Sequence, residues 1–167
     1  MRRFRLLLYI LTVFLLVSAN TQAQSPRGKD FGFGIVLGDP TGLTVKYWTQ
    51  NTNAFVFDLG ASYFGSPRIG MDYLWHFNAF NSNEVKLYAG PGVALGIGEG
   101  NGFWYKDKED GFLHRDNAGL GVRGVFGLNF VPRSTPIEIY AELGTLVGLV
   151  PDFGAAVDAA IGFRFYP

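Results

Sequence analysis

Residues 85–98 read Val-Lys-Leu-Tyr-Ala-Gly-Pro-Gly-Val-Ala-Leu-Gly-Ile-Gly, and this stretch decides the fold. Every second residue from Val85 onward is apolar, and the residues between them are mostly glycine, with Lys86 and Tyr88 at the start. Because successive side chains of a strand point to opposite faces, one face is apolar and the other is small and carries a lysine. A half-buried strand of a soluble domain would carry charges on its second face. The pattern is typical of a membrane-spanning barrel strand, with lipid outside and a tightly filled or watery lumen inside.

The same alternation occurs in seven further segments of the chain. We expect strands at residues 31–38, 43–48, 54–64, 69–77, 85–98, 118–130, 137–149 and 155–165. Residues 39–42 and 65–68 combine Pro with Gly and are expected to be turns. The even number of strands is the rule for single-chain bacterial barrels. The sequence therefore predicts an all-β fold, an eight-stranded antiparallel up-and-down transmembrane β-barrel.

The charged residues of the expected strands support this assignment. The apolar residues alone set which face of each strand points outward, and all nine strand charges then fall on the inward face, which random placement would achieve about once in 500. His76 has the same parity. The expected inward set is Lys46, Asp58, Asp72, His76, Lys86, Arg123, Glu138, Glu142, Asp158 and Arg164.

Two interpretations of the inward charges are open. They could line a selective pore, or they could pair with one another and fill the lumen. Eight strands enclose a space barely wide enough for side chains or one small ligand, so we favour a charged network that plugs the lumen. The inward glycines could line a cavity, or they could make room for basic side chains to lie across the lumen.

The first residues predict export. A basic start, Met1 to Arg5, precedes an apolar core of residues 6–17 and a small, polar region that ends at Ala23. This order is that of a signal peptide, and the apolar run is shorter than the roughly 20 residues of a spanning helix. We expect a signal peptide at 1–23, cleaved before Gln24, and a barrel domain at 24–167. The expected location is the outer membrane of a Gram-negative bacterium.

Composition excludes several classes of protein. The chain has no Cys, which excludes disulfides and thiolate chemistry. Removing the three arginines of the leader from the 14 basic residues leaves 11 against 14 acidic residues, a net charge of −3. This balance does not indicate nucleic-acid binding. We expect no metal and no cofactor, because the acidic residues of loop 99–117 lack the order of a calcium-binding loop.

The ends of the strands predict an orientation. If the N-terminus lies in the periplasm, aromatic residues collect at the periplasmic rim as an interfacial girdle. The girdle residues are Phe31, Phe33, Tyr47, Trp48, Phe55, Phe57, Trp75, Phe77, Phe130, Phe163, Phe165 and Tyr166. The same orientation places loop 99–117 outside the cell, where Phe103, Trp104, Tyr105 and His114 form a possible contact surface. Pro91 conflicts with its place in mid-strand, because it has no N–H for the ladder, and we expect a bulge or kink there.

At this level the chain resembles the small eight-stranded outer-membrane barrels of the OmpA/OmpX-like type. The resemblance covers the chain after the leader, and we expect no periplasmic domain after the barrel. The C-terminal residues 159–167 look like the signal by which the barrel-assembly machinery recognises its clients, and Phe163, Phe165 and Tyr166 carry that likeness. The resemblance implies two partners, outer-membrane lipid and the assembly machinery.

The sequence favours a structural or surface-interaction role, with a surface partner that it does not identify. One alternative is a carrier or narrow channel for a small molecule or lipid in a Gly-lined lumen. A less favoured alternative is a lipid A-modifying envelope enzyme, with His114, Asp116 and a serine at the same rim. Since no nucleophile, base and orienting group have a spacing that brings them together, we expect no enzymatic activity and no catalytic residues.

Overall fold

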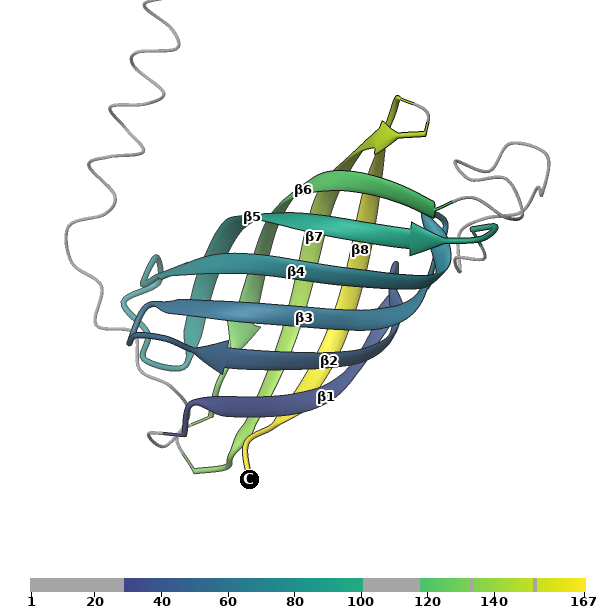
Figure 1. Ribbon diagram of the computed structural model, residues 1–167. Helices are drawn as coiled ribbons and strands as arrows, with labels where there is room; N and C mark the ends of the chain where they lie inside the picture. The colour runs from purple at the N-terminus through teal and green to yellow at the C-terminus, as the bar shows by residue number, and fades with distance from the viewer. Residues whose placement is uncertain (1–28, 101–117, 133, 152) are drawn as a thin grey trace, which may run out of the picture.

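The computed structural model describes residues 29–100, 118–132, 134–151 and 153–167. In this part of the chain, eight strands pair antiparallel in chain order and close into one barrel (Figure 1). They are β1 (Phe31–Gly38), β2 (Thr41–Trp48), β3 (Asn53–Ser62), β4 (Gly65–Phe77), β5 (Val85–Ile97), β6 (Ala118–Phe130), β7 (Ile137–Val150) and β8 (Gly154–Phe165). The predicted all-β fold, an eight-stranded antiparallel barrel, is confirmed.

The described residues include no helix that is long and apolar enough to cross a membrane. The predicted leader at 1–23, and Phe103, Trp104, Tyr105 and His114, lie outside the described residues.

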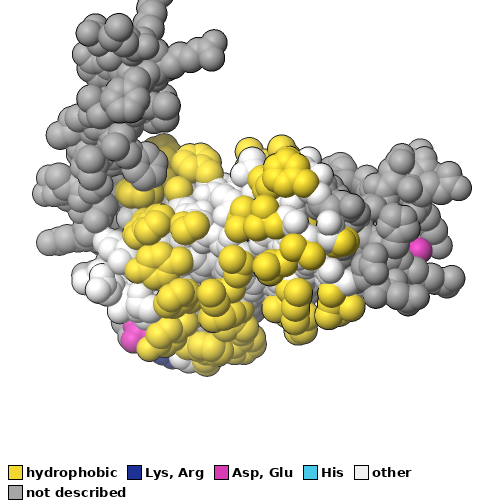
Figure 2. All heavy atoms as spheres, turned by 45° about the horizontal axis from the view of Figure 1, so that its top comes forward, with side chains coloured by type: hydrophobic (Ala, Val, Ile, Leu, Met, Phe, Trp, Pro, Cys, Tyr) yellow, Lys and Arg dark blue, Asp and Glu magenta, His cyan; other side chains and the backbone are white. Residues whose placement is uncertain are grey.

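The alternation in sequence becomes an apolar exterior and a polar interior. In β6, exposed and buried residues alternate strictly from Ala118 to Phe130. Leu120, Val122 and Phe126 are exposed, whereas Arg123 and Asn129 are buried. On the face drawn in Figure 2, hydrophobic side chains cover the barrel wall, and charged side chains appear only towards its ends. Because the sheet is closed, the strands have no free edge where they pair with their neighbours. Each strand therefore contacts its surroundings only through its inward and outward faces.

Inward glycines lie opposite the widest inward side chains. Tyr88 of β5 pairs with Gly127 of β6, and Tyr140 of β7 pairs with Gly162 of β8. A Cβ atom added at either glycine would overlap the facing tyrosine ring. The ring of Tyr166 covers Gly32 of β1 in the same way. These glycines therefore give tyrosine rings the room to lie flat against the inner wall.

Inward glycines also lie opposite two buried carboxylates. Asp72 faces Gly92 across β4 and β5, and Asp158 faces Gly144 across β7 and β8. A Cβ atom at either glycine would overlap the carboxylate oxygen opposite. The inward glycines were predicted either to line a cavity or to make room for basic side chains, but the side chains that occupy the space at these positions are tyrosine rings and carboxylates.

Two of the predicted turns have other bounds. The turn predicted at 39–42 is confirmed at Asp39 and Pro40 only, because β2 begins at Thr41. The turn predicted at 65–68 is wrong, because the chain turns at Tyr63 and Phe64 and β4 begins at Gly65.

Pairing between β3 and β4 shifts its register between Gly60 and Ser62. The extra residue lies on β4, and Ser62 keeps the inward parity of Asp58. Tyr63, expected to point outward from this strand, lies beyond the end of β3 and is buried.

Pro91 does not mark a bulge. It faces Gly124 of β6 in unbroken register. On the β4 side, the pairs Asp72–Gly92 and Trp75–Ala89 enclose an interruption of the ladder, and the register is the same before and after it. No residue is inserted, so the predicted bulge is wrong. The strands also approach closely here, because a Cβ atom at Gly90 would overlap the carbonyl oxygen of Tyr73.

Two residues of the predicted aromatic girdle lie inside the barrel. Trp48 and Tyr166 are 3% and 0% exposed, respectively. Both residues fall at inward positions of the strand alternation. Inside the barrel, Trp48 Nε1 donates to the Tyr166 hydroxyl, and that hydroxyl donates to Glu138. Phe163 and Phe165, in contrast, face outward and are exposed.

We expect Gly127→Ala to destabilise the barrel by about 1–3 kcal/mol, because the added methyl group meets the Tyr88 ring in a filled interior. Gly124→Ala is the matched control on the same strand. Its added methyl group would point outward, with Thr145 Oγ1 the nearest atom at 3.4 Å. Urea titration of both variants measures the difference. Equal stabilities would contradict the assignment of Gly127 to a packed position.

Candidate functional site

The structure places the predicted inward residues together in the interior of the barrel. Each of the ten side chains, nine charged residues and His76, is at most 8% exposed. They come from β2 to β8, and most are joined by ion pairs or hydrogen bonds into two clusters at different levels of the barrel. Asp58 and Lys86 are buried in the same interior.

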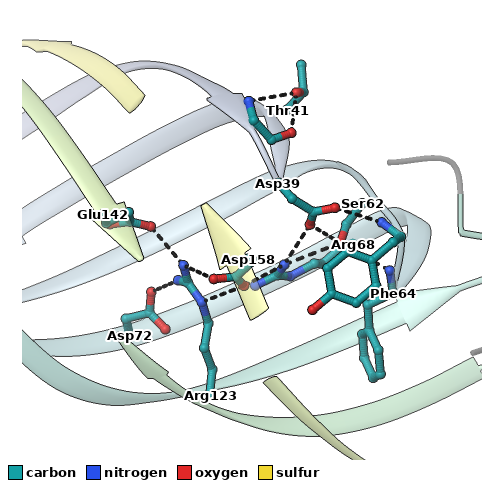
Figure 3. Close-up of polar contacts among 11 residues, drawn as sticks. Asp39, Thr41, Ser62, Phe64, Arg68, Asp72, Arg123, Glu142 and Asp158 are labelled. Atoms are coloured by element: carbon teal, nitrogen blue, oxygen red, sulfur yellow. Dashed lines mark hydrogen bonds and ion pairs between the residues drawn. The ribbon is translucent and has the colours of Figure 1, made fainter. Parts of the chain in front are cut away.

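Arg123 is the centre of the first cluster (Figure 3). Its guanidinium group pairs with Asp72 of β4, with Glu142 of β7 at 2.8 Å and with Asp158 of β8 at 3.1 Å. Tyr88 donates a further hydrogen bond of 2.8 Å to Glu142. A planar guanidinium group with five N–H donors suits this task, because it can donate to several carboxylates in different directions. Arg123 thereby ties three other strands to β6.

The first cluster extends to the rim through two residues that the sequence assigned to turns. Arg68 Nη1 lies 3.4 Å from Asp158 Oδ2 and 3.3 Å from Asp39 Oδ1. Asp39 also accepts hydrogen bonds from the Ser62 hydroxyl and, at 3.0 Å, from the Tyr63 backbone N–H. Burial raises the pKa of the Asp39 carboxyl above its usual value, and the bonds from Ser62 and Tyr63 oppose that rise.

Sequence reasoning missed Asp39 and Arg68 because Pro and Gly dominate their neighbourhood. The parity rule could have found Arg68, since it lies four residues before Asp72 and therefore shares its inward face. Asp39 gave no such signal, because it lies between β1 and β2.

The second cluster surrounds Glu138 at the opposite end of the barrel. Lys46 donates to Glu138 at 2.7 Å and lies 2.9 Å from His76 Nε2. Since the lysine ammonium can only donate, Nε2 of His76 accepts, and Nδ1 donates to the Thr52 carbonyl at 3.0 Å. Asn129 completes the set with a bond of 2.9 Å to Glu138.

Aromatic rings close the second cluster. Lys46 Nζ lies 4.2 Å from the centre of the Trp48 ring. The Tyr166 hydroxyl donates to Glu138 at 2.5 Å and accepts from Trp48 Nε1 at 3.1 Å. Cations over aromatic faces are stabilised by the ring quadrupole, most strongly when water is excluded. The C-terminal Tyr166 therefore connects β8 to side chains of β2 and β7.

Arg164 lies between the two clusters. Its Nε and Nη2 donate to the Thr44 hydroxyl at 3.1 and 2.8 Å, and its guanidinium carbon lies 3.8 Å from the centre of the Tyr140 ring. Nη1 lies 3.6 Å from Glu138. Arg164 thus covers the wall between β2 and β7 with both polar and ring contacts.

The two clusters differ in sign. Around Arg123 and Arg68 lie the carboxylates of Asp39, Asp72, Glu142 and Asp158, an excess of acid. Around Glu138 lie Lys46 and Arg164, an excess of base. Such charges are retained inside a protein only when they are paired and hydrogen-bonded, which describes these contacts. Their arrangement suits mutual neutralisation. Within the described ranges, no group of three His, Cys, Asp or Glu side chains could hold a metal ion.

Comparison with known proteins does not identify a family. No family model matches this chain, and no curated protein shows significant similarity to it.

We expect Arg123→Leu to lower the free energy of unfolding by about 3–5 kcal/mol, because it leaves Asp72, Glu142 and Asp158 buried without their shared cation. Replacing the exposed Lys29 by Leu is the control and should change stability by less than about 0.5 kcal/mol. Urea titration measures both. If Arg123→Leu unfolded at the wild-type urea concentration, the cluster would not hold the barrel together.

Proposed function

We propose that this chain is an outer-membrane β-barrel protein with a plugged lumen and a structural or surface-interaction role. One observation carries the proposal: side chains point the opposite way from those of a soluble barrel. Large apolar side chains such as Leu43, Phe126, Leu143 and Ile161 are 54–60% exposed, while the strand charges are buried. Soluble monomers rarely expose a continuous apolar surface of more than a few hundred Å².

The cost of charge in lipid supports the membrane location. An Arg or Lys on the lipid face of a barrel costs about 2–4 kcal/mol at the bilayer midplane. The absence of charged side chains from the outward faces of the described strands fits this constraint. Closure of the sheet fits it as well, since every backbone polar group in the hydrocarbon region needs a partner within the protein.

Charge pairing and ring packing support the plugged lumen over the carrier alternative. Arg123, Arg68 and Arg164 lie across the interior with their guanidinium groups in contact with side chains of other strands. At Gly127 and Gly162 the space beside the wall is occupied by tyrosine rings. A carrier needs a void at such positions, so the Gly-lined cavity is the less supported reading.

The orientation follows from the signal peptide and the resemblance to OmpA/OmpX-like barrels, both of which remain part of the proposal. With the N-terminus in the periplasm, the turns after β1, β3, β5 and β7 face the outside of the cell. The Arg68–Asp39 contacts then lie at the outer end, and the Glu138 cluster lies at the periplasmic end. The assembly machinery would read Phe163 and Phe165 from outside the barrel, as their exposed positions allow.

The membrane location is tested by a charge in the middle of β7. We expect Leu143→Arg to destabilise the barrel folded in phospholipid vesicles by about 2–4 kcal/mol. Phe153→Arg, beyond the end of β7 and 82% exposed, is the control and should cost about 0–1 kcal/mol. Folding is followed by the change in gel mobility between unheated and boiled samples. A chain that stays in aqueous solution and tolerates Leu143→Arg would contradict the proposal.

The plugged lumen is tested by electrical recording. We expect no steady current when the wild-type barrel is inserted in a planar bilayer, because side chains from opposite walls meet across the interior. A voltage ramp with a known porin as positive control checks the sensitivity of the recording. A stable open channel would overturn the plugged lumen without affecting the membrane location.

A further inference from the structure

The acidic and basic groups of the barrel interior are unequal in number. Among the described residues, six acids and five bases are buried, each at most 8% exposed. They are Asp39, Asp58, Asp72, Glu138, Glu142 and Asp158, with Lys46, Arg68, Lys86, Arg123 and Arg164. His76 does not supply the missing positive charge, because its Nε2 accepts from the Lys46 ammonium and therefore carries no proton. If every carboxyl group were ionised, one negative charge in the interior would have no counterpart.

The two charged clusters balance each other when Asp58 is left out. The first cluster has four carboxylates and the guanidinium groups of Arg68 and Arg123, so that two negative charges are in excess. At the other end, Lys46, Lys86 and Arg164 act on the single carboxylate of Glu138, so that two positive charges are in excess. Asp58 is therefore the acid whose charge has no counterpart.

The contacts of Asp58 differ from those of the other five acids. Each of the five forms at least one ion pair, whereas no Lys or Arg in the described part of the chain lies within ion-pair distance of Asp58. The side chain of Asp58 is hydrogen-bonded to the Thr44 hydroxyl. That hydroxyl accepts from Nε and Nη2 of Arg164, so its one hydrogen is left for Asp58. A neutral donor is thus the partner of this buried carboxyl group.

The charged and titratable groups that face Asp58 come from four other strands. They are Asp72 of β4, Arg123 of β6, Tyr140 and Glu142 of β7, and Arg164 of β8. Both arginines are already bound to other acceptors, Arg123 to three carboxylates and Arg164 to Thr44 and Glu138. Glu142 is the strongest like charge on Asp58. A proton on one of two neighbouring carboxylates removes their repulsion.

We propose that Asp58 is a proton-binding site in the middle of the lumen, neutral in the folded barrel, and that folding takes up one proton at this carboxyl group. A buried charge without an ion pair is costly, and a carboxylate in that position takes up a proton instead. The proton also brings the interior to zero net charge. The inference goes beyond the proposed function, because it makes the stability of the barrel depend on pH.

The direction of that dependence follows from linkage. In the unfolded chain an aspartate has released its proton above about pH 4. Folding then requires a proton from solution, so the folded barrel becomes less stable as pH rises. For one proton, the folding equilibrium constant falls by about tenfold per pH unit.

The direct test is the carboxyl carbon of Asp58 in the wild-type mature chain. The chain is labelled with carbon-13 at aspartate, folded in phospholipid bicelles, and the signal is assigned through the backbone. From about pH 5 to about pH 7 we expect Asp58 to keep the chemical shift of a protonated carboxyl group, although a free aspartate is ionised there. Asp158, which pairs with Arg68 and Arg123, is the internal control and should show the shift of a carboxylate.

Urea titration of Asp58→Asn gives an independent measurement. Asn keeps the shape of the neutral carboxyl group but binds no proton. Relative to this variant, the folding constant of the wild type should fall by about tenfold per pH unit between about pH 5 and pH 7. Asp30→Asn removes an exposed carboxylate and is the control, with the same pH dependence as the wild type.

Three outcomes would overturn the proton site. The first is a carboxylate shift for Asp58 at neutral pH. The second is a parallel pH dependence of the wild type and Asp58→Asn. The third is a wild-type stability that follows the sodium concentration at constant ionic strength and is independent of pH, which would indicate a bound monovalent cation. The carboxyl signal is measured on the wild type, so the result stands even if Asp58→Asn does not fold.

Discussion

The narrow interior of a closed eight-stranded sheet is the constraint on which the rest of the structure depends. Every second residue of every strand points into a space barely wide enough for side chains. Long side chains fit only where the facing wall residue is small, and Tyr88, Tyr140 and Tyr166 accordingly cover Gly127, Gly162 and Gly32. The high glycine content of the chain is therefore a packing requirement at these positions, in the way that small and large residues alternate in any close-packed core.

Charge adds a second requirement to this packing. A polar interior without room for bulk water must neutralise its own charges, because an unpaired buried ion is costly. Arg123 is the shared cation of Asp72, Glu142 and Asp158, and Lys46 and Arg164 both pair with Glu138, so the excess of acid in one cluster is offset in part by the excess of base in the other. The same contacts join strands that are far apart around the barrel. Replacing one charged residue of a cluster leaves several others without their partner. The effects of substitutions within one cluster are therefore expected not to be additive.

Alternation explains what could be predicted from sequence and what could not. It located all eight strands and the parity of their charges, because a period of two is a local property. It failed at the ends of strands: Tyr63 lies beyond the end of β3 and is buried, and the Gly-Ser-Pro start of β4 hid Arg68. Partners such as Lys46 and Glu138 could not be paired, since they are 92 residues apart and meet only through register. Trp48 and Tyr166 were placed at a girdle by residue type, although their parity pointed inward.

Strand register also shapes the rim. In a barrel the strands tilt, and successive strands are staggered relative to the barrel axis. The first hairpin turns early, with only Asp39 and Pro40 between β1 and β2, while β7 and β8 continue past that level to Val150 and Gly154. Closure between the first and last strands then necessarily leaves part of β8 without a neighbour. The β1–β8 pairing that closes the barrel thus ends before the start of β8, and the first residues of β8 have no neighbouring strand on that side among the described residues.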